Sequence, residues 1–526
     1  MDIRSAVCAL LPGVLALVGG SSAATAQGGV VQTGTSDTSM AQTNSPSSPV
    51  TPLAAGDSHV RIVRLSEIRG SVRMDRKTGH GLEPAIANMP IVEGARLETE
   101  VGLADVEFED GSALRLTPYS LIEFPQLILH GAGGMASTVR LVHGLMYVSL
   151  ANTKVNSFAV QVGDGSTNLL VAPSTHVRLE AEVGKVAASK DANAQPVAKL
   201  TIAVFTGSVA VQSPSGQSVV GKKETLTVGG LDGSQTGEPA VAKNVDKNAF
   251  DTWDKDEQSY QERYTKGNTF GGSAYNYGIS DMNYYGSFAN LGGGCGNVWQ
   301  PYFVGAGWDP YANGVWAMYP GAGYSWVSAY PWGWMPYHSG QWVNCGGAGW
   351  GWQPGGSFVG LNNVAGTVTN PANGTGTLVR SGPVRPTGGA SLVVAYRVPL
   401  AVSTINAQGN FEFRKNSAGL GVPRGDLGDL KEFSRGVGQH GMVSLPVAVA
   451  PSAGGPVQGV RGPATLRPST GGMERGNWGE GGAGSQASHA GGDNYGSGGH
   501  SSPPPSAGGG APSGGAQTSG AAGTHK

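Results

Sequence analysis

A repeated Trp-rich segment constrains this chain more than any other feature. Residues 299–352 hold nine of the eleven Trp residues. The unit W-x-P-Y-x-x-G-x-W occurs as WDPYANGVW at 308–316 and as WMPYHSGQW at 334–342, with a period of 26 residues. An imperfect third copy, WQPYFVGAGW, begins at Trp299. A fixed period of this length is typical of a repeat architecture.

The repeat predicts short strands with clustered rings. Aromatic residues favour strands, and the Pro-Tyr pair followed by Gly supplies a turn. Two interpretations remain open: the rings form the core of a small β-repeat domain, or some face outward as a platform for sugars or another chain. The candidate binding residues for the second interpretation are Trp308, Tyr311, Trp316, Trp326, Trp332, Trp334, Tyr337, Trp342, Trp350 and Trp352.

The first 26 residues have the pattern of a secretory signal peptide. Arg4 supplies the positive charge, residues 9–18 form a short apolar run, and Ala24-Thr25-Ala26 is a cleavage site. No later segment is apolar and long enough to span a bilayer. We therefore expect a periplasmic, secreted or cell-surface protein without an integral membrane segment after cleavage.

Cleavage would leave two of the three cysteines, Cys295 and Cys345, which bracket the Trp repeats. In an oxidising compartment such a pair tends to form a disulfide, so we predict one here. The alternative is two free thiols. Two lone cysteines lack the partner spacing of a zinc site, and we predict no metal and no cofactor.

Residues 27–57 have the composition of a disordered linker, and residues 58–228 then change character. Short runs of Val, Ile and Leu alternate with polar residues and are broken by Gly, Asp and Pro, which predicts a β-sandwich or a short β-solenoid. In the run 103–109, Val106 and Phe108 share one face. We expect Glu107, Glu109 and Asp110, near a turn, to be solvated.

Residues 58–228 resemble the FecR domain of bacterial envelope proteins. The resemblance rests on motifs along the whole segment: Gly70-Ser71-Val72, the run 92–99 (VEGARLET), Phe108-Glu109-Asp110-Gly111-Ser112, Tyr119-Ser120-Leu121-Ile122, Val139-Arg140-Leu141 with Gly144, the run 158–162 (FAVQV) and Gly207-Ser208-Val209. The resemblance implies that residues 58–228 have the β fold of FecR domains. The founding member of that family is a periplasmic sensor that passes a signal to a sigma factor.

Residues 229–247 read as a second linker, and residues 248–266 as a helix in which Phe250, Trp253, Tyr260 and Tyr264 recur at helical spacing. We expect this aromatic stripe to dock on a neighbouring domain. Residues 248–355 together resemble an uncharacterised Trp-rich domain that often follows FecR domains in secreted bacterial proteins. That resemblance implies no known activity.

The sequence of the C-terminal third of the chain predicts little regular structure. Residues 356–450 have scattered apolar runs among Pro and Gly, with no second core, and residues 451–526 form a low-complexity Gly, Ser and Pro tail that we expect to be disordered.

The sequence favours a protein that is not an enzyme, because no nucleophile elbow, zinc-protease motif, phosphate-binding loop or dinucleotide fingerprint is present. The net charge of −2 offers no basic field for nucleic acid. Three function classes remain. The favoured one is an exported binding or scaffold protein of the cell envelope, and the alternatives are a module that binds carbohydrate or peptidoglycan and a FecR-like signalling sensor. The expected partner is an envelope protein or a cell-wall glycan.

Overall fold

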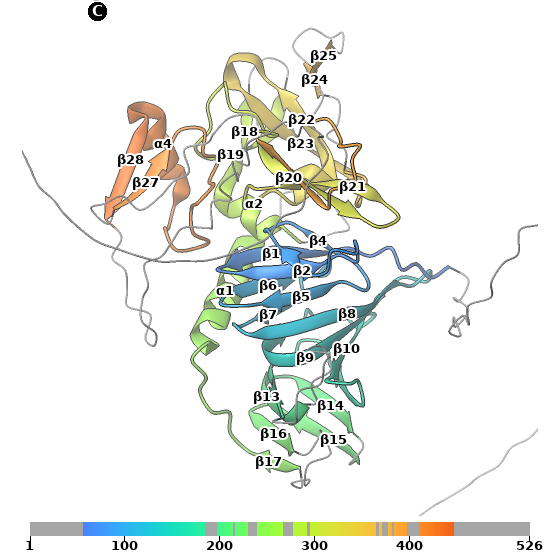
Figure 1. Cartoon of the computed structure of the whole chain (residues 1–526). Helices are drawn as coiled ribbons and strands as arrows, with labels where there is room; N and C mark the ends of the chain where they lie inside the picture. The colour runs from blue at the N-terminus through green and yellow to red at the C-terminus, as the bar shows by residue number, and fades with distance from the viewer. Residues whose placement is uncertain are drawn as a thin grey trace, which may run out of the picture. The chain divides into compact units, whose positions relative to one another are not determined.

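The computed structural model describes residues 56–184, 197–213, 216–229, 239–266, 277–291, 295–363, 368–370, 377–380, 383–396 and 410–446. The predicted signal peptide, most of the first linker and the predicted C-terminal tail lie outside these residues. The described part is mostly β, with four α-helices, which confirms the predicted fold class (Figure 1).

Seventeen strands build the β domain as two layers that share one long strand, β9 (Met135–Ser149). The first layer has the order β3 (Glu83–Pro84), β2 (Val72–Asp75), β5 (Arg96–Thr99), β8 (Ser120–Leu129), β9, β10 (Ser157–Val162), β11 (Thr167–Val171), β14 (Ser208–Ser213) and β15 (Gly216–Gly221). The second has the order β4 (Pro90–Ile91), β1 (Val63–Arg69), β6 (Leu103–Glu107), β7 (Ala113–Leu116), β9, β12 (His176–Val183), β13 (Val197–Thr206), β16 (Glu224–Gly229) and β17 (Ala240–Ala242).

Strand β9 joins the layers because it changes partners halfway along. Its first half pairs with β8 and, in parallel, with β10, whereas its second half pairs with β7 and β12. The change falls near Gly144, whose φ is +97°. A side chain at Gly144 would also collide with Ser120 of the neighbouring corner, so the bend requires glycine there.

The corners where the chain passes between the layers lie against one another. Gly70 meets Val101 and Gly102, and Gly207 meets Thr175. Residues with a left-handed backbone lie at most of these corners: Gly70, Tyr119, Gly144, Ser174, Gly207 and Lys223. The β domain is thus a two-layer sandwich, one of the two predicted architectures, with neighbouring corners packed on one another.

The interior of the β domain is aliphatic, as the alternating sequence pattern predicts. Strand β10 alternates strictly, with Phe158, Val160 and Val162 buried. Side chains from both layers, such as Leu65 of β1 and Met74 of β2, belong to one core. Burial of these rows fixes the register, because a shift by one residue would expose every buried side chain.

The Trp-rich module follows helix α1 (Asp251–Thr265), which confirms the predicted helix, and helix α2 (Ile279–Tyr285). One sheet has the order β18 (Gly286–Leu291), β19 (Gly296–Pro301), β23 (Trp350–Phe358) and β22 (Ser339–Asn344). The other has the order β21 (Gly323–Ser328), β20 (Asn313–Tyr319) and β26 (Leu392–Tyr396). Helix α3 (Met335–His338) and a 3₁₀ turn (Gly346–Ala348) complete the repeats, and β24 (Val368–Asn370) pairs with β25 (Thr377–Arg380).

Residues 410–446 add a further unit that the sequence did not predict. Strand β27 (Asn410–Arg414) pairs with β28 (Met442–Pro446), and helix α4 (Leu430–His440) lies between them in the chain. Phe411, Phe413 and Val437 join the aromatic core of the Trp-rich module. The sequence predicted no second core in 356–450, and these residues indeed extend the aromatic core of the Trp-rich module. Asp429 caps α4 by accepting a hydrogen bond from the backbone of Lys431 at 2.9 Å.

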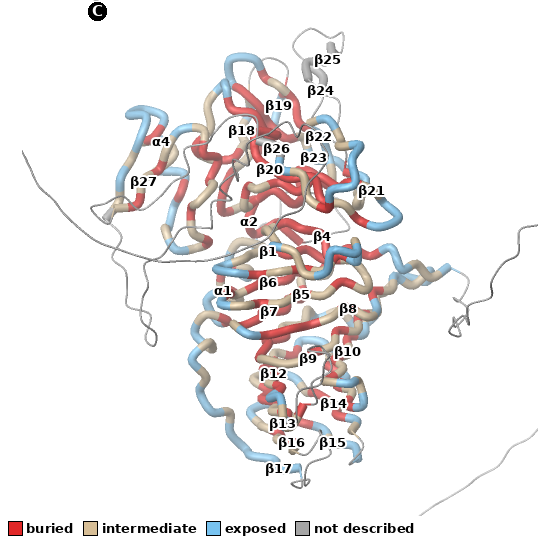
Figure 2. Tube along the Cα trace, in the orientation of Figure 1, coloured by how far each residue is buried: buried red, intermediate tan, exposed pale blue. Residues whose placement is uncertain are grey.

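Strand β20 contributes to both cores, because one of its faces packs in the aliphatic core of the β domain and the other in the aromatic core of the Trp-rich module. Val315, Ala317 and Tyr319 belong to the aliphatic core of the β domain. Trp316, between them, belongs to the aromatic core. Nearly all of β20 and β21 is buried (Figure 2). A strand that is apolar on both faces is what two packed cores require.

Candidate functional site

Each Trp-rich repeat folds as a β-hairpin with a ring pair directly across it. Trp316 faces Trp326 between β20 and β21, and Trp342 faces Trp352 between β22 and β23. The hairpin that comes first in the chain, β18–β19, has Phe288 opposite Trp299, so β20–β21 is the second hairpin and β22–β23 the third. The sequence showed Trp299 as the start of an imperfect copy, whereas the structure makes it the second-strand partner in a complete hairpin. Cross-strand aromatic pairs of this kind stabilise sheets.

A glycine lies beneath an indole in every hairpin. Gly286, Gly314 and Gly340 each stand two residues before the first ring, and a Cβ there would come within 2.3–2.8 Å of the indole of Trp299, Trp326 or Trp352, respectively. The G-x-W pattern is thus a packing requirement, because only glycine leaves room for the ring. The sequence reads G-S-F in the first hairpin, which is why the repeat was difficult to recognise there.

All ten candidate binding rings are buried. The exposed fraction is at most 6% for every member of the set Trp308, Tyr311, Trp316, Trp326, Trp332, Trp334, Tyr337, Trp342, Trp350 and Trp352. Trp332 shows why, since it packs on Trp299, Trp308, Tyr330 and Trp342 with centroid distances of 5.0–6.0 Å. These rings form the core, and the prediction of an outward platform built from them is wrong.

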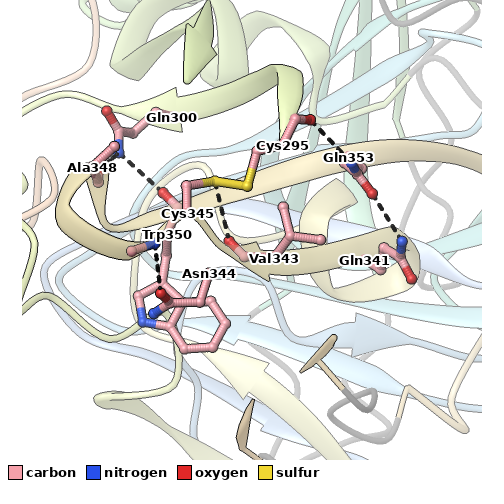
Figure 3. The surroundings of a disulfide bond; sticks show 10 residues. Cys295, Gln300, Gln341, Val343, Asn344, Cys345, Ala348, Trp350 and Gln353 are labelled. Carbon is pink, nitrogen blue, oxygen red and sulfur yellow. Dashed lines mark hydrogen bonds between the residues drawn. A yellow bond between two sulfur atoms is a disulfide. The ribbon is translucent and has the colours of Figure 1, made fainter. Parts of the chain in front are cut away.

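The other face of the β18–β19–β23–β22 sheet is covered by a disulfide between Cys295 and Cys345 (Figure 3). The sequence predicts this pairing. Both cysteines are buried together with Val298 and Val343, in a small cluster separate from the aromatic core. Around them Gln341 donates to Gln353 at 2.8 Å, and Gln353 donates to the carbonyl of Cys295 at 3.2 Å. The disulfide fastens the first hairpin to the third.

Where the module meets the β domain, charged side chains form a continuous network, in which all members but Glu67 and Arg69 are buried. We call this set the junction network: Arg64, Glu67, Arg69, Asp105, Glu107, Arg115, Asp254, Glu257, Asp281 and Arg424. Its members come from β1, β6, β7, α1, α2 and the segment before α4. Isolated charges in an apolar interior are costly, whereas paired and hydrogen-bonded ones are tolerated.

Asp281 of α2 lies near the centre of the junction network. Arg64 reaches it at 2.6 Å, Arg424 donates to it through Nε at 3.0 Å, and Tyr260 donates a hydrogen bond at 2.8 Å. Burial alone would raise the pKa of Asp281, but the guanidinium groups of Arg424 and Arg64 hold it below its usual range. Asp281 is therefore the ionised partner of two arginines that come from opposite ends of the described chain.

Two glutamates of the junction network behave differently. Burial raises the pKa of Glu107, against the attraction of Arg64. Burial also raises the pKa of Glu257 to about 8, with the nearby charge of Glu67 adding to the effect. Burial is the larger cause in both cases, and with a pKa of about 8 Glu257 retains its proton at neutral pH.

The prediction that Glu107 and Glu109 are solvated is wrong. Both are 4% exposed. Arg61 binds Glu109 through two hydrogen bonds of 3.0 and 2.8 Å, and Arg64 binds Glu107 at 3.1 Å. The sequence offers two arginines three positions apart: Arg64 lies opposite Glu107 of β6, and Arg61 binds Glu109 just after β6.

Helix α1 contacts the rest of the protein through acidic side chains as well as through aromatic ones. Asp254 pairs with Arg115 at 3.0 Å and with His176 at 2.7 Å, while Asp251 pairs with Arg178 at 2.7 Å. Tyr260, by contrast, belongs to the aromatic core, as the predicted stripe implies. The helix thus contacts the β domain with one part of its surface and the Trp-rich module with another.

Further hydrogen bonds reinforce the junction. Asn88 donates to the carbonyls of Ser328 and Tyr330 at 3.2 and 2.7 Å, and Tyr319 donates to the carbonyl of Pro90 at 2.8 Å. Arg76 of the β domain donates to Ser391 Oγ at 2.6 Å. These bonds satisfy carbonyls that would otherwise be buried without partners.

The Trp-rich module itself is nearly free of charge. Between residues 267 and 379 only Asp281 and Asp309 are charged, apart from His338, and all three are buried. Burial lowers the pKa of His338 to about 4, so it is neutral at physiological pH. Among the described residues no cluster of His, Cys, Asp and Glu is arranged to hold a metal ion. None of the described helices is both long enough and apolar enough to cross a bilayer.

Comparison with known proteins assigns part of the module. Residues 279–372 match a family of unknown function, DUF6600. No curated protein matches the chain. Two crystal structures from Parabacteroides distasonis, each described as a "putative anti-sigma factor", are similar at 14% and 13% identity, with TM-scores of 0.22 and 0.20. The alignments cover 30% and 28% of this chain and 63% and 58% of those chains, less than two thirds of either.

Proposed function

We propose that this protein is an exported, non-catalytic scaffold of the bacterial cell envelope, in which a FecR-like β domain holds the Trp-rich module in a fixed orientation. The observation that carries the proposal is the junction network, because it joins the β domain, α1, α2 and residues 410–446 through buried ion pairs. A ligand or partner bound to one element would therefore meet a surface whose geometry is set by the others.

The disulfide supports the exported location. Disulfides persist in oxidising compartments and are rare in the reducing cytosol. Cys295 and Cys345 are both buried, so their bond belongs to the folded interior and is not an exposed redox pair. Together with the signal-peptide pattern of residues 1–26, this favours the periplasm or the cell surface.

The test is cell fractionation of the full-length chain expressed in a Gram-negative host, followed by intact mass measurement. The proposal expects the protein in the periplasmic or surface fraction, with its N-terminus at Gln27 and with the mass deficit of two hydrogens that one disulfide produces. Recovery from the cytosol with an intact N-terminus and two free thiols would contradict it.

A FecR-like signalling role is the alternative that the β domain suggests, on the basis of the motifs within residues 58–228. It predicts that deletion of the gene alters transcription under the control of a sigma factor. An unchanged transcriptome in the deletion strain would leave the scaffold role in place and remove the signalling role.

A further inference from the structure

An open hollow of about 280 Å³ lies where the end of α1, helix α2, the end of β19 and the start of α4 meet. Its lining residues are Tyr264, Asn283, Tyr284, Tyr302, Gly428, Asp429 and Leu430. The volume is close to the lower end of the range for small-molecule sites, roughly 300–1,000 Å³. None of these residues was singled out as a binding candidate from the sequence.

Tyrosine rings form one wall of the hollow. Tyr264 and Tyr284 pack edge to face with centroids 5.0 Å apart. The hydroxyl of Tyr284 is fixed between the carbonyl of Pro423, to which it donates at 3.2 Å, and the amide of Leu427, from which it accepts at 3.3 Å. Tyr284 is buried, whereas Tyr264 and Tyr302 are only half-buried. The buried Tyr284 thus supports the wall, while Tyr264 and Tyr302 remain accessible to a ligand.

Two polar side chains of the lining, Asn283 and Asp429, each keep an oxygen that can accept a further hydrogen bond. Asn283 donates through its amide nitrogen to the carbonyl of Tyr264 at 2.6 Å, which leaves its amide oxygen as an acceptor. Asp429 uses one carboxylate oxygen to cap α4 and retains the other. The local structure therefore orients both side chains without saturating them.

The chemistry of the lining favours a neutral, hydroxyl-rich ligand. A sugar ring can place its C–H face on an aromatic ring and its hydroxyl groups against amide and carboxylate oxygens. Asp429 would repel an anion. The uncharged surface of the adjacent Trp-rich module also fits a neutral polymer.

We propose that this hollow is a subsite for one ring of a neutral saccharide. Its open form suits a residue within a longer glycan. The aromatic residues proposed to contact the sugar are therefore Tyr264 of α1 and Tyr302, which directly follows β19, and not the buried indoles. The proposal does not depend on export, because it concerns binding by the purified protein.

The test is titration calorimetry of the full mature chain with two probes, the hexamers of β-1,4-linked glucose and of N-acetylglucosamine. Saturable binding of at least one hexamer is expected. Tyr302→Ala should weaken it by about tenfold through loss of the ring. Tyr119→Ala is the matched control, because Tyr119 is 67% exposed on a corner of the β domain, and binding should be unchanged.

A second variant keeps the test decisive if Tyr302→Ala fails to fold. Asp429→Asn preserves the helix cap, since Asn is as good a cap as Asp, but it replaces the second carboxylate oxygen, an acceptor, by an amide group that donates. Reduced saccharide affinity with an unchanged melting temperature is expected. The proposal is overturned if neither hexamer binds, if binding is equal in Asp429→Asn and the parent protein, or if the hollow binds tetramethylammonium and no saccharide.

Discussion

Arg64 of β1 and Asp281 of α2 form an ion pair of 2.6 Å although 217 positions separate them in the chain, and their side chains are 0% and 1% exposed. Because each side chain would lose a buried opposite charge without the other, the two residues make the fold of the β domain and that of the Trp-rich module interdependent. Arg424 extends the same dependence to residues 410–446.

Asp281→Asn should destabilise the protein strongly. The substitution keeps the shape of the side chain but leaves Arg64 and Arg424 without their shared carboxylate, and breaking a buried pair in this way costs about 3–5 kcal/mol. Chemical denaturation measures the loss. Glu182→Gln is the control, because Glu182 and Lys199 are 47% and 46% exposed and their pair should contribute about 1 kcal/mol or less. Equal effects of the two substitutions would contradict the central place of Asp281.

Glu257 should make stability depend on pH. Burial and the charge of Glu67 raise its pKa to about 8 against the attraction of Arg424 and Arg69, while Asp105 adds repulsion. A carboxyl with a raised pKa favours the folded state only while protonated. Its contribution is therefore fully present below its unfolded pKa and is lost as the pH rises toward 8, by at most about 1.4 kcal/mol per pH unit.

Glu257→Gln removes this titration. Compared with the parent protein, the variant should gain relative stability between pH 5 and pH 8, as measured by denaturation at several pH values. Glu262→Gln, at an exposed position of the same helix, should follow the parent curve. Parallel curves for Glu257→Gln and the parent would show that Glu257 is ionised throughout.

The β domain was predictable because alternation is a local signal. Runs such as 158–162 place apolar residues on one face, and burial of that face follows directly. The buried Glu107 was not predictable in the same way, since its partners Arg64 and Arg424 lie on other strands and segments. A single sequence shows the charge of a residue but not the distant charge that compensates it.

Gly314→Ala should disrupt the second hairpin. The added methyl group would collide with the indole of Trp326, and overpacking of this kind typically costs about 1–3 kcal/mol. Thermal unfolding followed by Trp fluorescence measures the effect. Gly307→Ala is the matched control, because a Cβ there meets nothing within 4 Å and the backbone is not left-handed. A neutral Gly314→Ala would contradict the packing of the indole over the glycine.

Reduction of Cys295–Cys345 should lower the free energy of unfolding without abolishing the fold. The bond spans 50 positions, which corresponds to about 3–4 kcal/mol in the chain-entropy model. Denaturation with and without reductant measures the difference. The double variant Cys295→Ser/Cys345→Ser should match the reduced protein and be insensitive to reductant. Identical unfolding of oxidised and reduced protein would mean that the disulfide contributes nothing.

The candidate site was predicted only in part. The 26-residue period located the two Trp-Trp hairpins, and the disulfide followed from two cysteines that bracket the repeats in a protein expected to be exported. The direction of each ring was not predictable, since strand alternation assigns two faces but does not say which is covered. Here β20 is covered on both, by the β domain and by the aromatic core. The half-buried Tyr264 and Tyr302 are brought together only by tertiary packing.

The measurement that tests the central claim most directly is equilibrium unfolding of the full chain, followed by Trp fluorescence and by hydrogen exchange of the β-domain strands. Residues 58–228 contain no Trp, so fluorescence reports mainly on the Trp-rich module. If the junction network makes the two parts one cooperative unit, both signals should change at the same denaturant concentration. Two separate transitions, with the β-domain strands still protected after the indoles become exposed, would contradict the account.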